Sequence, residues 1–119
     1  MDIGMLIRWG SVVPGREEQA LALFDETVSF YGGLMEAGKV TSFEPFMYST
    51  SDFETEQGFF IVKGPIAAIF ETMDSDGYKN LVTKANLLLH HVSISLLTVG
   101  DGVVGQLDRF NKARMELHV

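Results

Sequence analysis

Two adjacent histidines, His90 and His91, are the residues of this sequence that first suggest metal chemistry. Neighbouring side chains point to opposite faces of a strand and lie about 100° apart around a helix. The two imidazoles therefore cannot easily hold one ion, and no third ligand stands at helical spacing from them. We expect no metal site, and we expect one imidazole to lie at the negative end of a helix.

Arg8 and Trp9 are adjacent in an apolar segment near the N-terminus. An arginine in the apolar surroundings of a sheet needs a partner for its charge. Arg8 could hold the carboxylate or phenolate of a ligand. Alternatively, it pairs with an acid such as Glu44 or with another subunit, which is the interpretation we favour.

The net charge of −7 limits the partners that this chain can have. Residues 1–59 carry three basic and ten acidic side chains, whereas residues 60–119 carry six of each. An acidic domain repels phosphate backbones and anionic lipids, which weighs against nucleic acid and membrane partners. The chain has no cysteine, no apolar run of about 18 residues and no pattern of a signal peptide at its start, so we expect a cytoplasmic protein.

The first half of the chain predicts a strand, a helix and a hairpin. Met5–Val13 is apolar and rich in β-forming residues, and a helix follows from residue 16 to Gly38, interrupted at Gly32-Gly33. Val40–Ser49 and Gly58–Lys63 then predict two strands. Pro45 cannot donate to a ladder, which indicates an edge strand or a bulge.

The second half predicts a broken helix, a strand and a terminal helix. Pro65 starts the helix, and Asp74 or Ser75 caps its continuation toward Leu88 or Leu89. Val92–Val99 is the last strand. Beyond it, helical spacing places four apolar side chains on one face of a terminal helix: Val103, Leu107, Phe110 and Leu117.

The order β-α-β-β-α-β-α predicts a single α+β domain over residues 1–119, with a ferredoxin-like βαββαβ unit and an extra C-terminal helix. Its four-stranded antiparallel sheet carries two helices on one face. Apolar residues lie on both faces of the strands, whereas a sheet with one wet face alternates more cleanly. We therefore expect the second face to be covered, by a partner chain or by the terminal helix.

Two segments carry a family resemblance. Pro14–Leu21, directly after an apolar strand, and Asp76–Leu81, before the last strand, resemble the corresponding segments of the dimeric α/β-barrel superfamily, and the chain is similar to its uncharacterised bacterial members. The resemblance implies a homodimer whose two sheets face each other. The superfamily includes cofactor-free quinol monooxygenases, heme-degrading enzymes, lactone isomerases and members without known activity.

The sequence and the resemblance together place a candidate site between the helices and the sheet. As in the uncharacterised members of that superfamily, we expect a homodimeric protein, here one that holds a small hydrophobic or aromatic ligand, without a cofactor. The alternative is a cofactor-independent monooxygenase of the quinol-oxidising or heme-degrading type, acting through Asn86, His90 and Trp9. The candidate ligand-binding residues are Arg8, Trp9, Tyr31, Tyr48, Phe60, Asn86 and His90.

Overall fold

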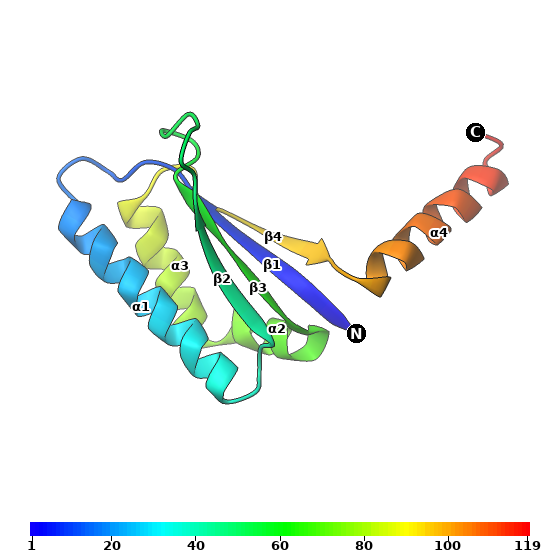
Figure 1. Ribbon diagram of the computed structural model, residues 1–119, viewed down its shortest axis with the longest axis horizontal. Coiled ribbons are helices and arrows are strands. Elements are labelled where there is room, and N and C mark those ends of the chain that lie inside the picture. The colour runs from blue at the N-terminus through cyan, green and yellow to red at the C-terminus, as the bar shows by residue number, and fades with distance from the viewer.

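The computed structural model describes residues 1–119 as a four-stranded sheet with four helices (Figure 1). The strands are β1 (Asp2–Trp9), β2 (Ser42–Met47), β3 (Gly58–Pro65) and β4 (Ser93–Thr98). The helices are α1 (Glu17–Glu36), α2 (Ile66–Asp74), α3 (Asp76–Leu88) and α4 (Asp101–Glu116). None of these helices combines the length and apolar character that crossing a membrane requires.

The strand order β2-β3-β1-β4, with every neighbouring pair antiparallel, is that of the ferredoxin-like fold. The predicted α+β class and sheet are therefore confirmed. Pro45 lies in β2, opposite Phe60, and β2 is an edge strand as the proline predicts. Because an edge strand needs partners on one side only, the missing amide proton costs no ladder bond there.

Helices α1, α2 and α3 cover one face of the sheet, as Figure 1 shows. Alternation along β1 directs Ile3, Met5, Ile7 and Trp9 toward these helices. The buried core forms where this row meets apolar residues of the helices and of β3. Its members are Ile3, Met5, Tyr31, Val40, Val62, Ile69 and Tyr78.

Strand β1 ends at Trp9, four residues before the predicted end at Val13. The chain leaves the sheet at Gly10, where an added Cβ would overlap the carbonyl oxygen of Glu54. The next residues bond to the end of α3 and to the segment after it, since the Gly10 amide donates to the His90 carbonyl and the Val13 amide to the Leu88 carbonyl, each at 2.8 Å. Contacts between segments distant in sequence therefore set the end of this strand.

The predicted break between α2 and α3 is confirmed at Ser75. Its hydroxyl accepts a hydrogen bond from the amide of Tyr78 at 3.2 Å and donates one to the carbonyl of Thr72 at 2.6 Å. This is the N-cap geometry that favours serine. Helix α1, by contrast, runs through Gly32-Gly33 without a break.

The second face of the sheet carries several apolar side chains and no helix. The alternative that the terminal helix covers this face within the same chain is wrong. Helix α4 points away from the sheet (Figure 1), and none of its residues is buried. By strand register, the apolar residues of this uncovered face are Leu6, Phe46, Phe59, Ile61 and Leu97.

Candidate ligand-binding pocket

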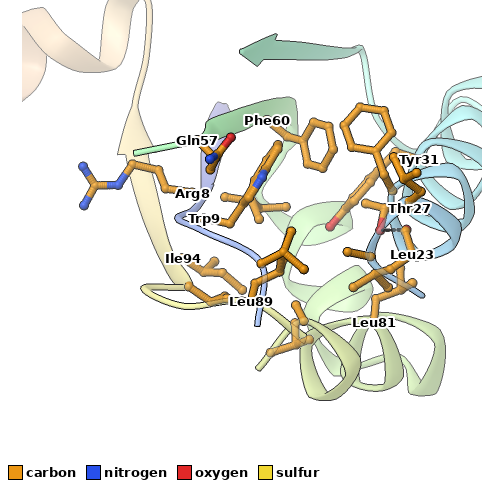
Figure 2. A pocket seen from close by; sticks show the side chains of 18 of the residues that line it. Arg8, Trp9, Leu23, Thr27, Tyr31, Gln57, Phe60, Leu81, Leu89 and Ile94 are labelled. Carbon is orange, nitrogen blue, oxygen red and sulfur yellow. Dashed lines mark hydrogen bonds between the residues drawn. The ribbon is translucent and has the colours of Figure 1, made fainter. Parts of the chain in front are cut away.

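A pocket of about 360 Å³ lies between α1, α3 and the sheet (Figure 2). Of its 21 lining residues, 17 are hydrophobic, so the space is an apolar one. Strands β1 and β4 contribute Ile7, Trp9 and Ile94, and the helices contribute side chains such as Leu23 and Leu81. The pocket therefore lies in the layer between helices and sheet that core side chains would otherwise fill.

Three aromatic rings form one wall of the pocket. Trp9 lies 4.8 Å from Phe60 and 6.2 Å from Phe24 between ring centroids, and Phe24 lies 5.4 Å from Phe60. Their tilted and edge-on arrangement is the geometry that aromatic pairs prefer. A flat aromatic ligand entering this pocket would find both faces and edges of rings to pack against.

Two tyrosines, Tyr31 of α1 and Tyr78 of α3, supply hydroxyl groups to this apolar lining. Burial raises the pKa of Tyr31 far above its ordinary value, and the nearby Tyr78 hydroxyl raises it further. Burial also raises the pKa of Tyr78. Both groups are therefore protonated at neutral pH, which makes them hydrogen-bond donors rather than bases.

Arg8 belongs to the lining, but its guanidinium points away from the pocket in Figure 2. Its Nε donates to the Ser93 hydroxyl at 3.3 Å. Arg8 forms no ion pair in this chain, so pairing with Glu44 is wrong, and pairing with another subunit stays a prediction. Register explains this: Arg8 stands opposite Phe59, whereas Glu44 stands opposite Ile61, one step further along the same face.

The structure brings together four of the seven predicted site residues: Arg8, Trp9, Tyr31 and Phe60 line the pocket. Tyr48 lines a second, more polar pocket of about 410 Å³, together with Arg8, Trp9, Glu56 and His91.

Asn86 and His90 line neither pocket, and both side chains are exposed. The Asn86 amide donates to the carbonyl of Val82, one turn earlier in α3. His90 lies beyond the end of α3 at Leu88, so the two residues do not share a helix face. The backbone of His90 instead pairs with the segment after β1, at Gly10 and Ser11.

Tyr78, Leu81 and Ala85 of α3 also line the pocket, although none of them was among the predicted site residues. Their spacing is the same for a core-facing stripe and for a pocket-facing one. The tyrosine within this stripe was the one sign in the sequence that a pocket could lie there, because a buried hydroxyl normally requires a partner. No three histidine, aspartate or glutamate side chains lie close enough together to hold a metal ion.

No family model and no curated protein matches the chain. Solved structures do match it in fold. Rv0793 from Mycobacterium tuberculosis is 17% identical, with a TM-score of 0.65 over 84% of this chain and 96% of that chain. A mutant of SnoaB, a cofactor-independent oxygenase from Streptomyces nogalater, is 14% identical, with a TM-score of 0.63 over 82% and 92%.

A dimeric α/β-barrel (DABB) family protein with a ferredoxin-like fold, from Mesorhizobium loti, is 11% identical. Its TM-score is 0.62 over 83% of this chain and 98% of that chain. At these identities the likeness establishes the fold alone. The protein has the ferredoxin-like fold found in dimeric α/β-barrel proteins, some of which are uncharacterised and some of which are cofactor-independent oxygenases.

Proposed function

We propose that this protein binds a small hydrophobic or aromatic molecule in the pocket between α1, α3 and the sheet. One observation carries the proposal: an apolar space of about 360 Å³ next to the Trp9, Phe24 and Phe60 rings. Ligand pockets commonly measure about 300–1,000 Å³ and are lined mainly by hydrophobic and aromatic side chains. An empty space of this size would otherwise lower stability, because the side chains around it lose packing contacts.

We further propose that the working unit is a homodimer in which the uncovered sheet faces meet. The apolar side chains of that face, Phe46, Phe59 and Ile61 among them, support this arrangement. A continuous exposed apolar surface on a small protein commonly marks an interface. The fold shared with the Mesorhizobium loti protein favours the same arrangement.

The oxygenase alternative has less support from the geometry. Of the three residues assigned to it, Trp9 lines the pocket, whereas Asn86 and His90 do not. The similarity to SnoaB, at 14% sequence identity, is a similarity of fold. The geometry therefore favours ligand binding, with no reaction assigned to the pocket. The cytoplasmic location stays a prediction.

Blocking the pocket tests ligand binding, with the fluorescence of the single tryptophan, Trp9, as the readout. Ala85→Phe places a large side chain in the pocket from α3. Leu87→Phe, on the same helix but 70% exposed, is the matched control. Titration with bicyclic aromatic compounds should quench or shift Trp9 emission in the wild type and in Leu87→Phe, and not in Ala85→Phe. No saturable change in the wild type with any such compound would refute the proposal.

The homodimer is tested by light scattering at micromolar concentration. Ile61→Glu puts a charge in the middle of the uncovered sheet face, and it should convert the dimer to a monomer. Leu87→Glu, on the far side of the molecule, should leave the dimer intact. A wild-type protein that scatters as a monomer would contradict this proposal.

A further inference from the structure

The hydroxyl groups of Tyr31 and Tyr78 form no hydrogen bond within the chain. Only the backbone amide of Tyr78 takes part in one, at the Ser75 cap. The hydroxyl of a buried tyrosine usually finds a partner, because leaving it without one costs roughly 1–3 kcal/mol. Two such groups beside one apolar pocket need an explanation.

The Tyr31 hydroxyl opens onto the pocket, and Tyr78 lines the same pocket from α3. Tyr31 is only 1% exposed and Tyr78 only 8%, so most of each ring is enclosed by the core. Yet no fully buried side-chain nitrogen or oxygen in this protein lacks a partner. The small accessible part of Tyr31 must therefore include its oxygen, and Figure 2 shows the Tyr31 ring reaching from α1 toward the pocket.

The other polar side chains of the lining are less available for a hydrogen bond to a ligand. The Thr27 hydroxyl already donates to the Leu23 carbonyl at 2.8 Å. The Arg8 guanidinium points away from the pocket. Glu17 is exposed and Gln57 is half-buried, so water satisfies them more readily than it does the tyrosines. Among the polar side chains that line this apolar space, Tyr31 and Tyr78 are thus the two that carry a neutral hydroxyl with no partner in the chain.

We propose that Tyr31 and Tyr78 select ligands that carry a neutral acceptor oxygen, a ketone or quinone carbonyl, on a hydrophobic or aromatic skeleton. This inference rests on the proposed ligand-binding function of the same pocket. A carbonyl accepts two hydrogen bonds and brings no charge into the apolar space. A carboxylate would be disfavoured because burying its charge is costly and no cation faces the pocket to pair with it.

The two hydroxyls lie close enough for each to influence the other, since Tyr78 contributes to the raised pKa of Tyr31. They extend from different helices, α1 and α3, and thus approach the pocket from two sides. One carbonyl oxygen placed between them would satisfy both donors at once. A hydrocarbon of the same shape would leave both without a partner, and this difference is the physical basis of selection.

A matched ligand pair tests the inference: 1-tetralone, a bicyclic aromatic ketone, and tetralin, the hydrocarbon of the same skeleton. Affinities come from Trp9 fluorescence and from calorimetry on the full-length protein. Wild-type protein should bind the ketone roughly 10-fold more tightly than the hydrocarbon. Tyr31→Phe and Tyr78→Phe should each reduce this preference, and the double variant should abolish it, with weaker binding of the ketone and binding of tetralin at least as tight as in the wild type. Tyr48→Phe, which removes a hydroxyl outside this pocket, should keep the preference.

The outcomes separate this inference from the proposed function. Equal wild-type affinity for ketone and hydrocarbon, unaffected by the Tyr→Phe variants, would overturn the inference and leave ligand binding intact. Failure of both compounds to bind would refute the pocket's function itself. Tighter binding of 2-naphthoate than of 1-tetralone would overturn the preference for a neutral acceptor. The variants should also fold at least as stably as the wild type, because each loses a hydroxyl that has no partner in the free protein.

Discussion

Trp9 and Gly58 stand directly opposite each other on β1 and β3, and the indole lies where a side chain at Gly58 would be. A Cβ at Gly58 would come within 2.8 Å of Trp9 Cζ2 and within 2.7 Å of the Phe46 carbonyl oxygen. The glycine therefore gives the tryptophan its place beside the pocket. This pairing links a small residue in the sheet to the aromatic wall that a ligand would contact.

Gly58→Ala should displace Trp9 and destabilise the protein by about 1–3 kcal/mol, because the carbonyl of Phe46 cannot move freely out of the way. The emission maximum of Trp9 should shift, and urea denaturation should give the loss of unfolding free energy. Gly33→Ala on α1 is the control, since nothing lies within 4 Å of a Cβ there. It should raise stability by up to about 1 kcal/mol, as expected for an alanine within a helix. Unchanged emission and stability in Gly58→Ala would contradict the role of this glycine.

Ser75 connects helix capping to the pocket, because it holds the first turn of α3 in which Tyr78 lies. Ser75→Ala should cost about 1 kcal/mol of unfolding free energy, since the Tyr78 amide loses its acceptor. Ser75→Asp should retain most of the wild-type stability, because aspartate is an equally favoured N-cap. Thermal and urea denaturation measure both effects. Unchanged unfolding free energy in Ser75→Ala would show that the cap contributes nothing.

Much of the fold could be predicted from local patterns. The alternation in β1, the proline of the edge strand and the serine between α2 and α3 each act through neighbouring residues. The aromatic pocket residues Trp9, Tyr31 and Phe60 could be predicted for a related reason. They are large side chains, and the spacing of the apolar residues along each strand or helix indicates which of its faces points inward.

Other features could not be predicted, because they depend on contacts between distant segments. The pairing at the end of α3, at Leu88, is one such feature, because the segment after β1 takes over the hydrogen bonds of Leu88 and His90 there. Nothing in the local sequence indicates that exchange. Similarly, the role of Tyr78 depends on an empty space that only the packing of α1, α3 and the sheet defines.

Helix α4 should be dispensable for the pocket within one subunit. None of its residues is buried, and its contacts are with the end of β4. Removing residues 101–119 should therefore leave the thermal midpoint and the ligand affinity measured by Trp9 fluorescence close to those of the full-length protein. The apolar side chains Val104, Leu107 and Phe110 are 60–69% exposed, which supports this expectation. A marked loss of ligand affinity would instead show that α4, from the same or a second subunit, helps to close the pocket.

The raised pKa of Tyr31 predicts how stability depends on alkaline pH. Above the ordinary tyrosine value of 10.0, the unfolded chain releases this proton, whereas the folded chain keeps it. The unfolded state then binds fewer protons, so stability falls as the pH rises beyond that value and is unaffected by this group below it. The contribution of Tyr31 approaches about 1.4 kcal/mol per pH unit. Tyr31→Phe removes the group, and its unfolding free energy in urea between pH 9 and pH 11 should decline less steeply than that of the wild type. Parallel curves for the two proteins would show that burial does not raise the pKa of Tyr31 above its ordinary value.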